Sequence, residues 1–71
     1  MSEYRFDVFG QRVAVVAADG GWVPYWLGDG KRRRADFEVP AFVGAHELAQ
    51  YLADLFHESA TPENAEVRRI D

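Results

Sequence analysis

The segment from residue 21 to residue 39 limits the possible folds more than any other part of this 71-residue chain. It reads GWVPYWLGDGKRRRADFEV, with two strand-like runs on either side of Gly28-Asp29-Gly30. Glycine and aspartate tolerate the positive φ angles of tight turns, so the pattern predicts two antiparallel strands, residues 22–27 and 32–39. Pro24 has no backbone N–H to give to a ladder, which predicts either a free strand edge or a bulge at that position.

Two further strands are expected before this hairpin. Residues 4–9 alternate apolar and charged side chains, which is the period of a half-buried strand. Gly10-Gln11 suits a tight turn, and residues 12–18 are apolar on both faces, which suggests a central strand or a face covered by a partner. Asp19-Gly20-Gly21 predicts the next turn, so these strands follow one another as a meander.

Residues 45–59 have the period of an amphipathic helix, with the apolar side chains in an arc of roughly 200°. Gly44 is an acceptable N-cap, and Val43 could pack on Leu48. The predicted fold class is therefore α+β, an antiparallel three- to four-stranded meander sheet with one C-terminal helix packed on one face. Residues 1–60 form a single domain, and residues 61–71 are a tail that is a short helix, a strand or disordered.

Composition narrows the classes of protein. A chain of 71 residues without cysteine has neither a disulfide nor a thiolate zinc site, so oligomerisation is the remaining common means of stabilising a small core. We therefore expect a homodimer. A net charge of −4 does not favour non-specific attraction to phosphate. No apolar run approaches the roughly 18 residues of a membrane span, and the first residues do not look like a signal peptide, so we expect a cytoplasmic protein without membrane partners.

Large aromatic side chains suggest an interaction surface. Trp22 and Trp26 should share one face of their strand, with Tyr25 on the other, if Pro24 does not change the register. One face would pack on the helix, and the other would meet a partner or be covered by Phe42 and the tail. The first hypothesis is therefore a non-enzymatic, homodimeric protein-interaction module, and its interaction residues would be Trp22, Tyr25, Trp26 and Phe42.

The basic run from Lys31 to Arg34 supports a second hypothesis, a small nucleic-acid-binding or regulatory protein. Lys31, Arg32 and Arg34 could contact phosphates or guanine edges. The alternative is a solvated turn, because alternation would place Asp36 and Glu38 on the same face as Arg32 and Arg34. That acidic interleaving, with the net charge, favours the first hypothesis.

A local resemblance accompanies this run. The order W-x-x-Y-W, G-K-R-R-R, F-x-V-P and then H-E-L-A resembles arm-type DNA-binding domains of tyrosine recombinases, from Trp22 to Leu55. The resemblance implies a three-stranded sheet, backed by a helix, that enters the major groove of DNA. As a whole the chain also looks like short uncharacterised bacterial proteins grouped as domains of unknown function, a resemblance that implies no activity and no site.

Patterns for catalysis or metal binding are not found. His46 and His57 are eleven residues apart, about 16 Å along a helix, and so cannot share a metal. Asp54 and Glu58 have no apolar surroundings in the sequence that would raise a pKa for acid catalysis. We therefore expect no catalytic residue, no metal ligand and no cofactor. An enzyme subunit stays open only if two chains build one site.

Overall fold

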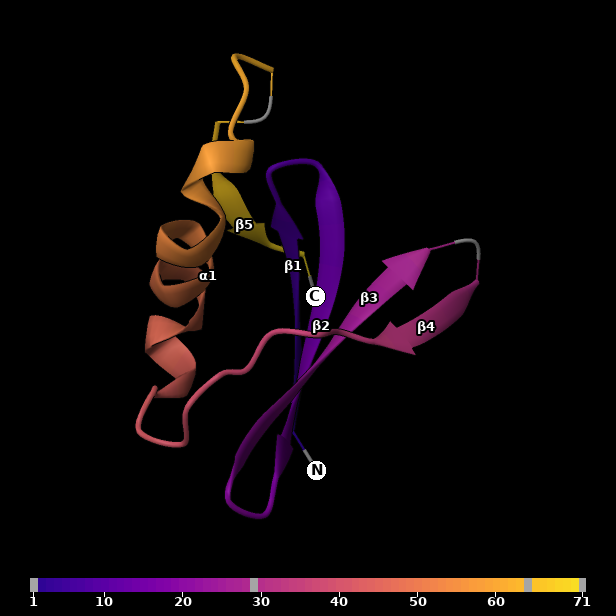
Figure 1. Cartoon of the computed structure of the whole chain (residues 1–71), viewed down its shortest axis with the longest axis vertical. Coiled ribbons are helices and arrows are strands. Elements are labelled where there is room, and N and C mark those ends of the chain that lie inside the picture. Colours follow the sequence, from indigo (N-terminus) through magenta and orange to yellow (C-terminus); the bar gives the residue numbers. More distant parts are fainter. Residues whose placement is uncertain (1, 29, 64, 71) are drawn as a thin grey trace.

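The computed structural model describes residues 2–28, 30–63 and 65–70, which form an antiparallel sheet with one helix on one side (Figure 1). The sheet has five strands in the order β4-β3-β2-β1-β5, and the helix lies between β4 and β5 in the chain. The strands are β1 (Glu3–Val8), β2 (Gln11–Ala18), β3 (Gly21–Gly28), β4 (Lys31–Arg34) and β5 (Val67–Arg69). The helix α1 (Leu48–Phe56) has a 3-10 turn at each end, η1 (Ala45–Glu47) and η2 (His57–Ser59). The α+β class and the antiparallel sheet with a C-terminal helix are confirmed.

The expected number of strands, three or four, was wrong because the tail adds a fifth. β5 pairs antiparallel with β1 and brings Val67 beside Val8 on the core side of the sheet. Of the three alternatives for the tail, a strand is the one found, at residues 67–69. Three residues are too few for a period-two pattern to stand out in a sequence, so neither length nor alternation could separate this strand from a loop.

The first turn lies one residue earlier than predicted. β1 ends at Val8, and Phe9 and Gly10 form the turn with φ angles of 50° and 94°. Two successive positive φ angles belong to the type of two-residue turn whose twist matches that of the flanking strands. The Gly10 N–H donates to Asp7 Oδ1 at 2.8 Å, which supports the turn from the strand side. Asp29 of the third predicted turn lies outside the described residues.

β4 is shorter than the predicted strand 32–39, and Pro24 explains where it ends. The Ala35 N–H donates to the Pro24 carbonyl at 3.0 Å, just beyond the last β3–β4 pair, Tyr25 with Arg34. Since the N and O atoms of a strand residue point the same way, the donor that proline lacks is missing on the β4 side. The β2–β3 register runs through Pro24 without a bulge, so a free edge is the alternative found. After Arg34 the chain touches β3 again only at an isolated bridge between Val39 and Trp22.

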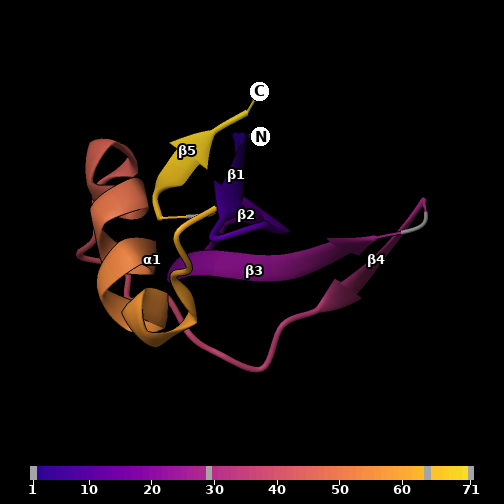
Figure 2. The same cartoon turned by 90° about the horizontal axis from the view of Figure 1, so that it is seen from above.

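The core lies between α1 and one face of the sheet (Figure 2). The helical segment begins at Ala45, as the sequence predicts, but its first turn is the 3-10 turn η1 and not α-helix. The Glu47 N–H donates to the Gly44 carbonyl and the Glu47 carboxylate accepts from the Gly44 N–H, both at 2.8 Å. The buried apolar cluster is contributed by β1 and β2, by the connection before α1 and by the helix. Its members are Phe6, Val8, Val13, Val15, Val39, Val43, Leu48 and Leu52. Val43 and Leu48, for which the sequence suggests a direct contact, both belong to this cluster.

Candidate functional site

The face of the sheet away from α1, here called the open face, carries a set of arginines around a small apolar strip. Since Phe6, Val13 and Trp26 lie on the helix side, their strand neighbours alternate to the open face. The open face is made up of Glu3, Arg5, Asp7, Arg12, Ala14, Val16, Val23, Tyr25, Leu27, Arg32, Arg34 and Arg68. Five arginines there stand against two carboxylates, although the whole chain has a net charge of −4.

Strand register brings these arginines together from distant parts of the chain. Arg12 pairs with Leu27, and Leu27 pairs with Arg32 on its other side. In the next row on this face, two residues along, Arg5 is opposite Ala14 and Arg34 is opposite Tyr25. Arg32 and Arg34 were expected at the site, but Arg5 and Arg12 were missed. The signal for them was the alternation in residues 4–9 together with the turn that follows it, because these place both side chains on the same face.

One carboxylate joins two of the arginines. Glu3 Oε2 accepts from Arg5 Nε at 2.7 Å, and Glu3 Oε1 accepts from Arg32 Nη2 at 2.8 Å. The hydrogen bond from Arg32, and after it the one from Arg5, lowers the pKa of Glu3. The guanidinium of Arg32 also lies over the Tyr25 ring, 4.6 Å from its centroid. Arg32 is therefore held from two sides, by a ring beneath it and by a carboxylate at its tip.

The contact between Glu3 on β1 and Arg32 on β4 joins two opposite corners of the sheet. It shows that the open face is hollowed along the diagonal between these corners. β1 and β4 are separated by two strands, so in a flat sheet they would lie about 14 Å apart, with a further offset along the strands. Twist makes a sheet saddle-shaped, and along one diagonal it brings opposite corners together on one face. A hollow of about 1010 Å³ lies there, and its lining includes Arg5, Arg12 and Leu27 with the Glu3–Arg32 pair. The hollow extends to the end of the β3–β4 hairpin, where Lys31 and Arg33 also line it.

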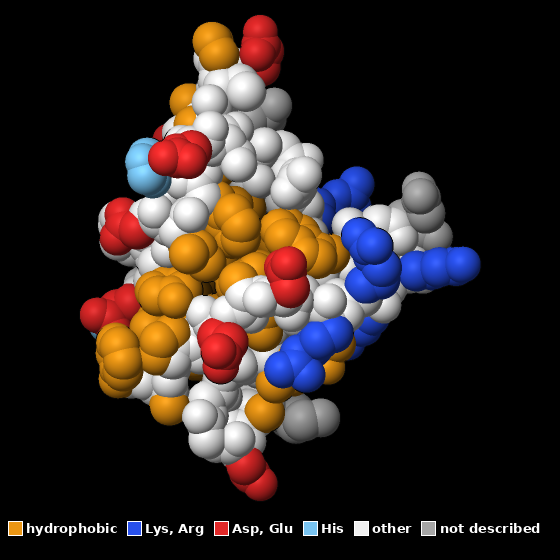
Figure 3. Space-filling view, viewed as in Figure 1, with side chains coloured by type: hydrophobic (Ala, Val, Ile, Leu, Met, Phe, Trp, Pro, Cys, Tyr) orange, Lys and Arg blue, Asp and Glu red, His pale blue; other side chains and the backbone are white. Residues whose placement is uncertain are grey.

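The remaining basic residues of the run from Lys31 to Arg34 differ in position. Lys31 is opposite Gly28 and Arg33 is opposite Trp26, so both alternate to the helix side of the hairpin, whereas Arg34 shares the open face with Arg32. On the side of the molecule shown in Figure 3, Lys and Arg side chains gather over β3 and β4. Asp and Glu lie over the helix and the ends of the molecule, and others lie in the middle of the view beside the basic side chains. Among the described residues, Arg12 and Arg34 have no ion-pair partner.

The acidic interleaving expected at Asp36 and Glu38 rested on a strand that does not continue so far. β4 ends at Arg34, so neither residue belongs to the strand pairs that carry Arg5, Arg12 and Arg32. The Glu38 carbonyl accepts from the Tyr51 hydroxyl of α1 at 2.9 Å. Strand alternation therefore does not place these carboxylates on the arginine face, although Glu38 and Arg34 line one hollow beside the end of β4.

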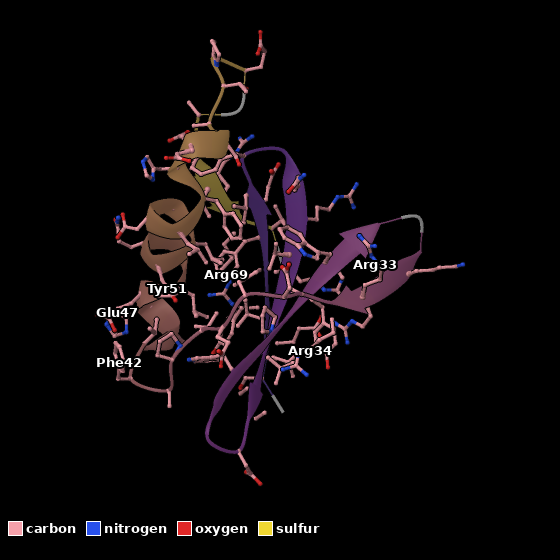
Figure 4. All side chains as sticks on the ribbon, in the orientation of Figure 1. Arg33, Arg34, Phe42, Glu47, Tyr51 and Arg69 are labelled. Atoms are coloured by element: carbon pink, nitrogen blue, oxygen red, sulfur yellow. The ribbon has the colours of Figure 1, made fainter. Side chains whose placement is uncertain are left out.

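The four predicted interaction residues do not form one surface. Trp22 and Trp26 share the helix side and pack against the core, where Trp22 Nε1 donates to the Val43 carbonyl at 2.7 Å. The Trp26 ring meets those of Phe37 and Phe56 edge-on, with centroids 5.7 Å apart in both pairs. Tyr25 lies on the open face. Phe42 is 86% exposed beside the start of α1, far from the arginines of β4 in Figure 4.

The histidines and carboxylates of the helix lie on its solvent side. His46, His57, Asp54 and Glu58 are exposed. Within residues 2–28, 30–63 and 65–70, no three His, Asp or Glu side chains come close enough to one another to hold a metal ion. In the same residues no helix has the length and hydropathy needed to cross a lipid bilayer.

Fold and open face together define a small α+β domain whose sheet is covered on one side and presents arginines on the other. The chain belongs to the family described as Domain of unknown function (DUF7661), which matches residues 3–71. Neither the curated proteins nor the solved structures contain a match to it. The resemblance to uncharacterised domains of unknown function is therefore confirmed, and the local resemblance to recombinase arm-type domains is not shown.

Proposed function

We propose that this domain is a non-enzymatic binding module that holds the phosphate backbone of a nucleic acid on its open face. The observation that carries the proposal is the gathering of Arg5, Arg12, Arg32 and Arg34 from three strands on a sheet face that α1 leaves uncovered. Guanidinium groups present several N–H donors in a plane that matches phosphate oxygens. The half-buried Tyr25 ring lies beneath the Arg32 guanidinium, 4.6 Å from it, and holds that group over the open face.

The net charge of −4 opposes this function less than it first suggests. At physiological ionic strength, charges on the surface are screened beyond about 8 Å. Glu47, Asp54 and Glu58 belong to the exposed side of the helical segment, which packs on the other face of the sheet. A ligand on the open face therefore responds mainly to the five arginines and two carboxylates of that face.

The test compares two double variants that remove the same charge from neighbouring positions. We expect a fluorescein-labelled single strand or duplex of about 20 nucleotides to bind the wild type, with an affinity that falls steeply with salt. Arg12→Gln with Arg34→Gln should weaken binding at least about tenfold and lower the salt slope by about two, since two phosphate contacts are lost. Both arginines lack an ion pair in the described part of the chain, so the fold should be unchanged.

Lys31→Gln with Arg33→Gln is the comparison, because these residues alternate to the other side of the same hairpin and meet the hollow only at the hairpin end. A smaller loss is expected for this variant than for Arg12→Gln with Arg34→Gln. Fluorescence anisotropy at about 50 mM and about 150 mM salt measures both variants. An equal loss in the comparison variant would mean that binding follows the total charge of the hairpin and not the open face. No binding by the wild type at low salt would overturn the proposal.

A second candidate, a homodimeric protein-interaction module, is favoured by one observation. Phe42 is 86% exposed and Leu55 is 45% exposed, and exposed large apolar side chains are more frequent at interfaces than elsewhere on a surface. Analytical ultracentrifugation of the wild type and of Phe42→Ser tests it. If this second function is correct, the wild type is a dimer and Phe42→Ser weakens its association. A wild type that is monomeric at high concentration would refute this function.

A further inference from the structure

The Glu3 carboxylate occupies the point at which two guanidinium groups of the open face converge. Each of its oxygens accepts from a different arginine, Arg5 at 2.7 Å and Arg32 at 2.8 Å. These arginines come from strands that lie at opposite sides of β2 and β3. The two arginines thus bind one anionic group with two terminal oxygens, and in the free protein this group is the domain's own Glu3 carboxylate.

We propose that this point is a phosphodiester subsite, which Glu3 fills in the free protein and which one backbone phosphate of the ligand takes over on binding. A phosphodiester carries one negative charge shared by two non-bridging oxygens, and a carboxylate carries the same charge on two oxygens. The phosphate can therefore accept the same two hydrogen bonds, one from Arg5 and one from Arg32. This inference rests on the proposed function and names one contact that it uses.

The exchange is feasible because the ion pairs are accessible to solvent. The side chains of Glu3, Arg5 and Arg32 are 29%, 54% and 42% exposed, so solvent can replace the carboxylate without opening the core. Ion pairs of this exposure contribute little to stability, and breaking one for a comparable contact costs little.

The two arginines would stay close to position when the carboxylate leaves. Arg32 remains over the Tyr25 ring, with its guanidinium 4.6 Å from the ring centroid. Arg5 stays in the middle of β1, between its pairing partner Ala14 on β2 and the Ile70 N–H, which donates to the Arg5 carbonyl at 2.9 Å. Arg12 lines the same hollow and is placed to meet a neighbouring phosphate of the same strand.

The test is the substitution Glu3→Gln, which removes the competing charge and keeps the size of the side chain. We expect its affinity for a labelled single strand of about 20 nucleotides to rise roughly three- to tenfold at physiological salt, because an exposed ion-pair partner no longer competes. Asp7→Asn is the matched control. It removes one charge from the same strand and the same face, and the asparagine oxygen can still accept from the Gly10 N–H. We expect it to raise affinity less than Glu3→Gln does, since Asp7 is opposite Arg12 but lies outside the Arg5–Arg32 contact.

A second experiment identifies the chemical group that enters the subsite. Titration of labelled protein with a dinucleotide should shift the Arg5 Nε–H resonance and the Glu3 carboxyl carbon together. Inorganic phosphate at equal concentration should shift them less if the subsite belongs to a backbone that also meets Arg12. An equal response to inorganic phosphate would overturn the assignment to a phosphodiester.

The outcomes separate this inference from the function on which it rests. If the wild type binds through Arg12 and Arg34 but Glu3→Gln binds no more tightly, the subsite is refuted and the proposed function stands. Equal gains in Glu3→Gln and Asp7→Asn also refute the subsite, since only net charge would then matter. If neither the wild type nor Glu3→Gln binds at low salt, both proposals fall. Adding Arg5→Gln to Glu3→Gln should remove the gain, and a persistent gain would show that Arg5 is not part of the subsite.

Discussion

Substitution of Trp26 tests whether this side chain stabilises the fold or forms an interface. Its ring is in contact with Phe37 and Phe56 at 5.7 Å, and those two rings also meet each other at 5.0 Å, so three edge-on pairs form one cluster. Replacing a packed tryptophan by alanine costs about 3–5 kcal/mol, of which about 1–3 kcal/mol would come from the two edge-on pairs that Trp26 makes. A 71-residue domain has a total stability of about 4–10 kcal/mol. Trp26→Ala should therefore remove at least about a third of the stability of the domain, and all of it if the total lies at the lower end of that range.

Urea unfolding followed by circular dichroism measures this cost without depending on tryptophan fluorescence. Phe42→Ala is the control, because at 86% exposure its loss should change the unfolding free energy by no more than about 0.5 kcal/mol. Each unfolding curve is measured at two protein concentrations about thirtyfold apart, since the midpoint of a dimer depends on concentration. A cost below about 1 kcal/mol for Trp26→Ala, or a larger cost for Phe42→Ala, would refute the ring cluster as a source of stability. A wild-type midpoint that rises with concentration while that of Trp26→Ala does not would instead assign Trp26 to an interface.

Three smaller perturbations test other parts of the structure. Because Arg32 and then Arg5 lower the pKa of Glu3, its ionised form contributes stability that is present above the ordinary carboxyl pKa and is lost as the pH falls through the lowered pKa. The difference in unfolding free energy between wild type and Glu3→Gln should thus shrink on acidification, and a difference that grows would contradict the ion pairs. Tyr51→Phe removes the hydroxyl that donates to the Glu38 carbonyl at 2.9 Å and should cost about 0.5–1.5 kcal/mol in thermal unfolding. Gly20 has a φ of 81° with open space around it, so Gly20→Val should cost about 1–2 kcal/mol through the backbone alone, and no loss would mean that the turn relaxes.

Local patterns predicted those elements whose signals lie within a few consecutive residues. The helical segment, its start at Gly44 and the first three strands follow from periodicity and turn residues, and the structure has them within one or two residues. β5 and the end of β4 could not be read in that way. β5 is a strand because β1 offers an unpaired edge, and β4 ends because Pro24, ten residues earlier in the chain than Arg34, lacks a donor on that side. Both features depend on a neighbouring strand and not on the segment itself.

The sequence predicted only part of the candidate site, for the same reason. A run such as the one from Lys31 to Arg34 draws attention because its residues are adjacent in sequence, yet alternation divides it between two faces. Arg5 and Arg12 join Arg32 only through register, and register follows from turns whose exact residues the sequence left uncertain by one position. The pairing of Glu3 with Arg32 depends further on the twist of the whole sheet, which brings opposite corners together and which no local pattern contains. That pairing gives the open face a defined binding geometry in addition to its charge, because two guanidinium groups converge on a single anionic group only where the sheet is hollowed.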